Sequence, residues 1–251
     1  MIWQMILNKM ELVHELLGYE RIKIVQREDM LRLSLDSMLV ADFVDTSKVN
    51  GKIIDLGTGN APIPLFLTLK TNSPIYAVDI QEDACKLARR SVEINGLENQ
   101  ITVINENIKD IYKKVGHDEF EVVVSNPPYF KYIESSKVNK NDFLTIARHE
   151  VLITLEELVS EAKKLLVDGG SFYMVHRAER LSDILVALEK ENLGLKKIRF
   201  VHSKENDDEA LLVLISARKN KKSVVKVLKP LYVYDKNGNY TSEVKNIFNF
   251  K

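Results

Sequence analysis

The chain has one cysteine, Cys85, among its 251 residues. A single thiol excludes an intrachain disulfide, and so sparse a use of cysteine fits a reducing, cytoplasmic setting. Cys85 lies beside Ala84 and Ala88 on the apolar face of a predicted helix, where a small buried side chain is more plausible than a nucleophile. The sequence also lacks a His/Cys/Asp cluster with the spacing of metal ligands, so we expect no metal site.

Long apolar runs are absent too, and no stretch approaches the length of a membrane span. Residues 1–7 are apolar, but they lack the basic leader and the small-residue cleavage site of a signal peptide. We therefore expect a cytoplasmic protein without a membrane partner.

The chain also has no excess of charge of either sign, because 36 basic side chains balance 36 acidic ones. Charge therefore gives no independent support for a nucleic-acid partner, although a local basic patch remains compatible with it. The apolar share of 45% is that of an ordinary globular protein. The length suits one large domain with small additions, and we assume a monomer.

The most informative segment present is Asn126-Pro127-Pro128-Tyr129, which follows the apolar run 120–125. The Asn126 amide oxygen and the Pro127 carbonyl can each accept one N–H of a planar amino group, which aims its lone pair at an electrophile. The prolines stiffen the turn, and the ring of Tyr129 offers a flat face for stacking. We predict Asn126, Pro127 and Tyr129 as catalytic residues, although an ordinary strand-ending turn can have the same composition.

A second informative segment, residues 52–62, runs from a β-branched strand through a glycine turn into an apolar helix. Gly57 and Gly59 would let a ligand approach the backbone, and Pro62 suits the first position of a helix. Asp79 closes the next predicted strand, where a carboxylate can bind both hydroxyls of a ribose. Together these features predict a nucleotide-type binding site.

Two details distinguish this site from one for a nicotinamide or flavin dinucleotide. The dinucleotide fingerprint requires a glycine where this chain has Pro62. Asp55, just before the glycines, would repel a pyrophosphate but attract an ammonium group. Both details favour S-adenosyl-L-methionine as the cofactor.

Alternating strands and helices predict an α/β fold with a doubly wound, mostly parallel Rossmann-like sheet and helices on both faces. We expect parallel strands at 52–56, 75–79, 101–105, 120–125 and 170–175. We expect helices at 62–71, 81–95, 109–115, 151–167 and 178–192, the fourth ended by Asp168-Gly169-Gly170. The linker between strands 196–203 and 210–217 is short, so these two should pair as an antiparallel hairpin that supplies the terminal antiparallel strand.

We divide the chain into a lead-in (1–50), a cofactor-binding core (51–218) and a C-terminal extension (219–251). The lead-in should contain short strands at 21–26 and 31–34 and then a helix, with Asp36 either capping that helix or facing the cofactor. The extension should begin with a basic turn at 218–222 and continue as a hairpin over 231–240 with an Asn-Gly turn.

Asp55 to Gly59, Val78-Asp79 and Asn126 to Tyr129 together resemble the Rossmann-like methyltransferases that methylate exocyclic amino groups. Ser34 to Ser37, Asp55 to Leu67 and Ala147 to Glu150 look more specifically like the bacterial tRNA1(Val) adenine-N6 methyltransferases. That family modifies the adenosine 3′ of the anticodon in a valine tRNA. The resemblance extends from about Gln26 to the C-terminus.

The resemblance implies a set of site residues for a tRNA methyltransferase that uses S-adenosyl-L-methionine. Asn107 and Ile108 would contact the adenine ring, with Asp110 as the alternative, although Asn107 can also cap the following helix. The implied cofactor-binding residues are Asp36, Asp55, Gly57, Thr58, Gly59, Asp79, Ile80, Asn107, Ile108 and Asn126. The residues expected to contact the tRNA substrate are Lys131, Arg148, Lys219, Lys221 and Lys222.

Other acceptors remain open, because the tetrapeptide fits any planar amine. A protein glutamine (N5), a ribosomal RNA guanine (N2) and a DNA adenine present the same two-hydrogen geometry. A DNA enzyme usually has a separate base-reading domain, for which this chain has little room. A non-enzymatic alternative is an RNA chaperone or regulator that binds the same cofactor.

Overall fold

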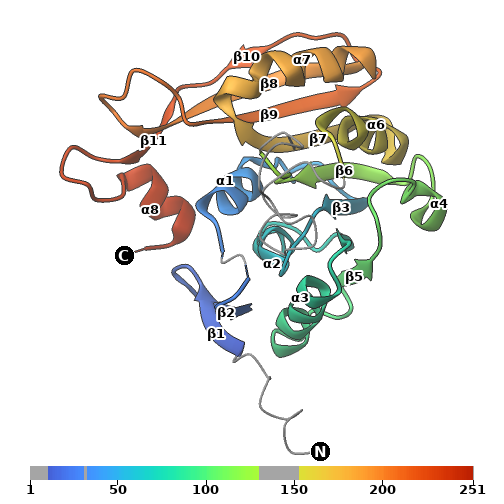
Figure 1. The fold of residues 1–251 in the computed structure, drawn as a ribbon, viewed down its shortest axis with the longest axis horizontal. Helices are drawn as coiled ribbons and strands as arrows, with labels where there is room; N and C mark the ends of the chain where they lie inside the picture. The colour runs from blue at the N-terminus through green and yellow to red at the C-terminus, as the bar shows by residue number, and fades with distance from the viewer. Residues whose placement is uncertain (1–10, 31–32, 130–152, 251) are drawn as a thin grey trace, which may run out of the picture.

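The computed structural model describes residues 11–30, 33–129 and 153–250. A large twisted sheet crosses the molecule, with strands in the order β10-β8-β9-β7-β6-β3-β4-β5 and with β11 beside β8 (Figure 1). Five parallel strands form its centre and one side: β3 (Lys52–Leu56), β4 (Ile75–Asp79), β5 (Ile101–Asn105), β6 (Phe120–Ser125) and β7 (Leu166–Arg177).

The other side of the sheet contains the predicted antiparallel pairing. β9 (Leu212–Lys219) lies between β7 and β8 (Leu193–Lys204) and runs antiparallel to both. Two short strands, β10 (Lys226–Val227) and β11 (Leu231–Tyr234), pair in parallel along the outer edge of β8. The predicted fold class and the predicted hairpin of β8 and β9 are confirmed.

Helices cover both faces of the sheet because the side chains of a buried strand alternate between its two sides. In β6, Val122 and Val124 belong to one apolar core and Val123 belongs to the other. The first core is covered by α1 (Leu35–Phe43), α2 (Pro62–Leu67), α3 (Glu82–Ile94) and α8 (Ser242–Phe248). The second is covered by α4 (Tyr112–Val115), α6 (Leu155–Leu165) and α7 (Leu181–Lys190), which follows the 3-10 turn Ala178–Arg180.

Several predicted helix boundaries are corrected. α2 ends at Leu67, and α4 begins only at Tyr112. α6 ends at Leu165, so Asp168-Gly169-Gly170 does not end a helix but lies inside β7. Gly169 has a φ of 72° there, and the register of β7 against β6 shifts next to it. The glycines therefore form a bulge in a strand.

The lead-in forms a separate two-stranded sheet. β2 (Tyr19–Arg27) confirms the strand predicted at 21–26, and it pairs antiparallel with β1 (Glu11–Leu16), which we did not predict. Of the strand predicted at 31–34, residues 31 and 32 lie outside the described part, and residues 33 and 34 are not in a strand. α1 is capped by the hydroxyl of Ser34, which accepts the Ser37 N–H, and not by Asp36.

The C-terminal segment differs most from prediction. The expected hairpin is reduced to one antiparallel bridge, Tyr234 to Tyr240, around a turn at residues 235–239. β11 instead pairs with β8, since Leu231 and Val233 are buried in the main core. The chain then forms α8, which we did not predict.

The turn of the lead-in hairpin lies next to α8, near the C-terminal end of the described chain, as Figure 1 shows. The Gly18 N–H donates to the Phe248 carbonyl (2.9 Å), and the Asn249 amide donates to the Gly18 carbonyl (2.9 Å). The Tyr19 hydroxyl donates to the Ile247 carbonyl at 3.0 Å. No helix among the described residues is long and apolar enough to span a membrane.

Gly18 is the tightest point of this contact. A Cβ at this position would lie 2.3 Å from the carbonyl oxygen of Asn249, which is backbone and moves only with α8. We expect Gly18→Ala to lower the free energy of unfolding by about 2 kcal/mol. Chemical denaturation of this variant and of Glu20→Ala, at an exposed position two residues later, would measure the difference. Equal stability of the two variants would contradict the tight contact.

Candidate active site

Four turns meet at the carboxyl edge of the parallel strands. In the register of the sheet Leu56 pairs with Ser125, and Asp79 pairs with Asn105. The segments after β3, β4, β5 and β6 therefore leave the sheet at the same level, as expected for a ligand site of an open parallel sheet. The Ser125 hydroxyl donates to the Leu56 carbonyl (2.7 Å), which ties the two central strands together at this edge.

The glycine turn is folded against β4. The N–H groups of Gly57 and Thr58 both donate to the Val78 carbonyl at 2.9 Å. Gly57 and Gly59 have φ values of 78° and 57°, which favour glycine. A Cβ built on Gly59 meets no atom within 4 Å, so this part of the turn faces open space.

Asp55 is fully buried at the end of β3. Neither of its carboxylate oxygens, nor the hydroxyl of Thr58, has a well-formed hydrogen bond among the described residues. Burial raises the pKa of Asp55 to about 7, and the neighbouring Asp79 carboxylate adds to the rise. A buried carboxylate without a donor is costly, so this position is suited to an ammonium group from a ligand.

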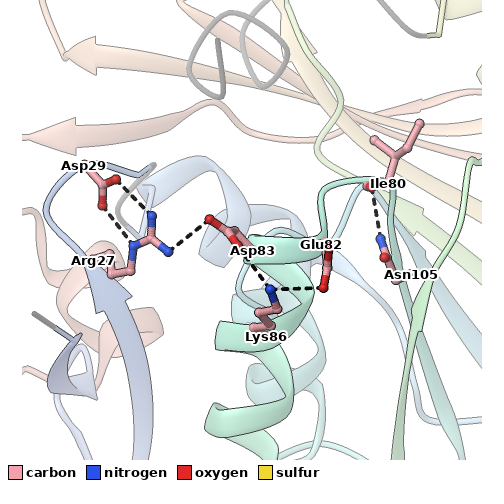
Figure 2. Close-up of polar contacts among 7 residues, drawn as sticks. All are labelled: Arg27, Asp29, Ile80, Glu82, Asp83, Lys86 and Asn105. Atoms are coloured by element: carbon pink, nitrogen blue, oxygen red, sulfur yellow. Dashed lines mark hydrogen bonds and ion pairs between the residues drawn. The ribbon is translucent and has the colours of Figure 1, made fainter. Parts of the chain in front are cut away.

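Asp79 is fixed at the end of β4. Its carboxylate accepts the N–H groups of Gly59 (2.8 Å) and Gln81 (2.9 Å), while burial raises its pKa. The Asn105 amide donates to the carbonyls of Asp79 and Ile80, each at 3.0 Å. Figure 2 shows the second of these bonds and the Ile80 side chain, which is 38% exposed beside it. An exposed apolar side chain next to a buried carboxylate suits a ligand with both an aromatic ring and hydroxyls.

The turn after β5 separates Asn107 from Ile108. Ile108 is buried, and its Cδ1 atom lies 4.0 Å from a Cβ built on Gly57, so it packs beside the glycine turn. Asn107 is exposed, and its side-chain oxygen accepts the Lys109 N–H at 2.9 Å. Asn107 therefore stabilises the turn itself. Asp110, the alternative, forms an ion pair with Lys113 at 2.8 Å.

These residues fit S-adenosyl-L-methionine by their chemistry. Asp55 offers a buried carboxylate with no well-formed hydrogen bond for the ammonium, Gly59 offers open backbone, and Asp79 stands where a ribose can be bound. Ile80 offers apolar contact for the adenine. In the described part of the chain, no group of three His, Cys, Asp or Glu side chains is placed to hold a metal ion.

Asn126 lies directly after β6 and is held at both ends of its amide. The amide nitrogen donates to the hydroxyl of Ser37 (3.0 Å) and, at 3.4 Å, to that of Ser34. The Tyr129 hydroxyl lies 2.7 Å from the Asn126 side-chain oxygen and 2.6 Å from Asp36 Oδ2. The first turn of α1 and the predicted catalytic tetrapeptide thus form one hydrogen-bonded unit.

Tyr129 is also held by residues from the end of β7 that sequence reasoning missed. The His176 ring lies 5.3 Å from the Tyr129 ring, and the Arg180 guanidinium donates to the Tyr129 carbonyl at 3.3 Å. Burial and the nearby Arg180 charge lower the pKa of His176 to about 4, so its ring is neutral. Neither residue belongs to a recognisable sequence pattern. Ser34 and Ser37 could have been identified from the sequence, since they flank Asp36 in the segment that supports the resemblance.

α1 is fixed at its far end by Lys70, whose ammonium donates to the carbonyls of Ala41 (3.1 Å), Asp42 (2.5 Å) and Val44 (2.6 Å). A cation at a helix C-terminus satisfies the last carbonyls and the helix dipole. This contact fixes the axis of α1, and therefore the place of Ser37 next to Asn126.

The lead-in is joined to the same edge of the molecule by a charged cluster (Figure 2). Arg27 at the end of β2 binds Asp29 through two N–H groups at 2.9 Å and binds Asp83 at 3.1 Å. Asp83 and Glu82, in the first turn of α3, also pair with Lys86 at 3.6 and 3.0 Å. Arg27 thereby fastens β2 to the helix that follows Asp79 and Ile80.

Three of the predicted tRNA-contacting residues, Lys219, Lys221 and Lys222, lie away from this edge. Lys219 is buried and pairs with Asp118 and the Leu166 carbonyl, and Lys221 pairs with Asp168 at 3.1 Å. Asp118 precedes β6 and Leu166 is the first residue of β7, so this basic turn lies at the amino edge of the sheet, opposite Asn126. Lys222 is exposed in the same turn. Lys131 and Arg148 lie outside the described residues.

The pKa of Asp55 leads to a prediction for stability. The folded chain binds this proton more tightly than the unfolded chain, so the contribution of Asp55 to stability is present at low pH and is lost as pH rises from about 4 through about 7. The loss amounts to about 4 kcal/mol if the carboxylate stays dry. We expect Asp55→Asn to gain stability relative to the wild type as pH rises across this range. Urea unfolding of both cofactor-free proteins at several pH values would measure this, and parallel pH curves would contradict it.

Comparison with known proteins identifies the family of the chain. Residues 33–191 match the model of the family described as Methyltransferase small domain. The tRNA1(Val) (adenine(37)-N6)-methyltransferase of Phocaeicola vulgatus is 30% identical over 184 residues, which is 73% of this chain and 76% of that protein. The release factor glutamine methyltransferase of Flavobacterium psychrophilum is 28% identical over 163 residues, 61% of this chain and 56% of that protein.

Solved structures agree on the fold. A predicted O-methyltransferase from Agrobacterium tumefaciens superposes with a TM-score of 0.69 at 20% identity, over 86% of this chain and 96% of that one. The match to the methyltransferase family model makes S-adenosyl-L-methionine the cofactor, as predicted. The chain belongs to the methyltransferase small domain family, among relatives that include tRNA1(Val) (adenine(37)-N6)-methyltransferases.

Proposed function

We propose that this methyltransferase transfers a methyl group to N6 of an adenine in tRNA, the adenosine 3′ of the anticodon in a valine tRNA. The observation that carries the proposal is the Asn126 amide, held at the carboxyl edge of β6 beside the glycine turn of β3. The identity of 30% with the Phocaeicola vulgatus enzyme supports the choice of acceptor.

In the proposed reaction, S-adenosyl-L-methionine supplies an electrophilic methyl on its sulfonium. Asp55 binds the ammonium end, and Asp79 binds the ribose. The Asn126 oxygen and the Pro127 carbonyl accept the two hydrogens of the adenine amino group, which directs the nitrogen lone pair. No general base is required at the start, because the proton on the methylated nitrogen is acidic and leaves to water.

A glutamine side chain is the second candidate acceptor, favoured by the similarity to the Flavobacterium psychrophilum enzyme. Its amide has the same two N–H donors, so Asn126 and Pro127 would serve it equally well. A ribosomal RNA guanine, a DNA adenine and a non-enzymatic RNA chaperone or regulator are further alternatives from sequence, and no contact in the described residues favours them.

Asn126→Ala tests the assignment of the amide. We expect the rate of methyl transfer to fall about 100-fold or more, because one of two acceptors for the amino group is lost. The affinity for S-adenosyl-L-methionine should change little, since Asp55 and Asp79 remain. Isothermal titration with the cofactor and a single-turnover methylation assay would separate the two effects. Near-normal turnover in the purified variant would remove Asn126 from the reaction.

Transfer of labelled methyl to cell fractions tests the acceptor. Total RNA and total protein would be prepared from cells that lack the enzyme, and each would be incubated with it. We expect label in tRNA, recovered as N6-methyladenosine after nucleoside analysis. Label in a protein of release-factor size would instead establish the glutamine reaction.

Tyr129→Ala tests whether the tyrosine ring supports the base. We expect KM for the methyl acceptor to rise about tenfold, the typical effect of losing one base-stacking contact. Cofactor affinity should change less, because Asp55, Asp79 and Ile80 are unaltered. Parallel measurements of acceptor KM and cofactor Kd decide this, and equal losses in both would place Tyr129 on the cofactor side.

A further inference from the structure

Asp36 stands in a place that the resemblance does not explain. The resemblance assigns it to the cofactor, yet its carboxylate lies 2.6 Å from the Tyr129 hydroxyl. That hydroxyl in turn lies 2.7 Å from the Asn126 oxygen. Asp36 therefore reaches the catalytic amide through Tyr129.

The protons in this chain of contacts can be counted. A tyrosine hydroxyl has one proton, while an ionised carboxylate and an amide oxygen only accept. With the Asn126 oxygen facing Tyr129, two short contacts from one hydroxyl to two acceptors are both satisfied only if Asp36 contributes a proton of its own. Asp36 then donates to Tyr129, Tyr129 donates to the Asn126 oxygen, and the Asn126 nitrogen donates to Ser37.

Ionisation of Asp36 changes this arrangement. The carboxylate draws the Tyr129 proton to itself, and the Asn126 oxygen then faces the lone pairs of the Tyr129 oxygen at close range. The Asn126 oxygen loses a donor that occupied one of its lone pairs, and it becomes a better acceptor for an incoming amino group.

We infer that Asp36 is a positioning residue for methyl transfer, which sets the state of the Asn126 oxygen through the Tyr129 hydroxyl. This inference rests on the proposed role of Asn126 as an acceptor for the amino group. It holds for an adenine and for a glutamine acceptor alike, because both present the same two hydrogens.

Opposing effects act on the pKa of Asp36. Burial raises the pKa of Asp36, while the Tyr129 hydrogen bond, its own backbone N–H and the Arg177 charge at the end of β7 oppose the rise. Burial and Asp36 raise the pKa of Tyr129 well above its ordinary value, so the phenol keeps its proton. The other groups around Tyr129 are the neutral His176 ring and the Arg180 guanidinium on its carbonyl.

The sign of the pH dependence follows. At low pH Asp36 is neutral, Tyr129 donates to Asn126, and transfer is slow. As pH rises through the pKa of Asp36, the Asn126 oxygen is released and transfer becomes faster. Asp36→Asn stands in for the neutral acid, since its amide nitrogen can donate to Tyr129 and its side chain has no group that ionises in this pH range.

Single-turnover rates at saturating cofactor and acceptor, measured from pH 5 to pH 9, test the inference. We expect Asp36→Asn to be about tenfold slower than the wild type at high pH and to converge with it at low pH. Ser37→Ala is the matched control, because it affects the other end of the same amide without a titrating group. It should slow transfer by a constant factor at every pH.

Two results would overturn the inference. One is an equal loss for Asp36→Asn at every pH, which indicates a purely structural role. The other is a weaker Kd for S-adenosyl-L-methionine in Asp36→Asn with a normal rate at saturation, which returns Asp36 to the cofactor.

A second measurement does not depend on any methyl acceptor. Carbon-13 NMR of the Asp36 carboxyl, in the wild type and in Tyr129→Phe, would follow its titration directly. We expect a midpoint above that of ordinary aspartate in the wild type, and a higher midpoint in Tyr129→Phe because the opposing hydrogen bond is gone. Identical midpoints would overturn the inference even if Asp36→Asn failed to fold. Failure of the proposed function would appear separately, as wild-type enzyme that transfers no methyl group to RNA or protein.

Discussion

The hydrogen bonds between the first turn of α1 and the Asn126 amide join parts of the chain that are about 90 residues apart. A side-chain amide rotates freely unless both of its ends are held, and an acceptor for an amino group must be held before the substrate arrives. α1 can do this because Lys70 fixes its C-terminus and Ser34 caps its N-terminus. The proposed catalytic tetrapeptide is therefore held by a helix outside the parallel core, so the lead-in is joined to the candidate site.

The Asp55 carboxylate is buried but, unlike the Asn126 amide, is not held by hydrogen bonds of good geometry. It has been removed from water with no well-formed hydrogen bond among the described residues, at a cost to stability that grows as the group ionises. A cofactor ammonium would supply the missing charge, so part of the binding energy offsets a cost already present in the free enzyme. Cofactor binding and folding stability are consequently coupled through this one side chain, with Asp79 and the glycine turn fixing the rest of the ligand. The Asp36 chain differs, because every member there has a hydrogen-bond partner.

Local pattern was sufficient for the central strands of the sheet and for the edge at which the candidate site residues lie. Apolar runs ending in Asp55, Asp79 and Asn126 locate three strands and their carboxyl edge, and the register confirms that these ends meet. The predictions that failed concern elements whose positions depend on contacts between residues far apart in the sequence. β11 joins β8 because an open strand edge was available, which no local pattern in residues 231–234 reveals, and the Gly169 bulge resembles a helix stop in sequence. His176 and Arg180 reach Tyr129 only because β7 lies next to β6. Asp36 was identified as a site residue, but its partner could be seen only in three dimensions.

Acceptor choice must come from outside the tetrapeptide, because adenine and glutamine offer the same two hydrogens to Asn126 and Pro127. Charge gives little support for RNA as the acceptor. The net charge of the chain is zero, and Lys219 and Lys221 are paired with acidic groups at the edge opposite the site. A paired lysine releases few counterions on binding a phosphate, so this turn can add only weakly to affinity for RNA. Selection of an adenine over a glutamine side chain then depends on contacts that the enzyme makes with the adenine ring. Tyr129 is the aromatic residue adjacent to Asn126, and its hydroxyl and carbonyl are both anchored, which leaves its ring as a fixed surface rather than an adaptable one.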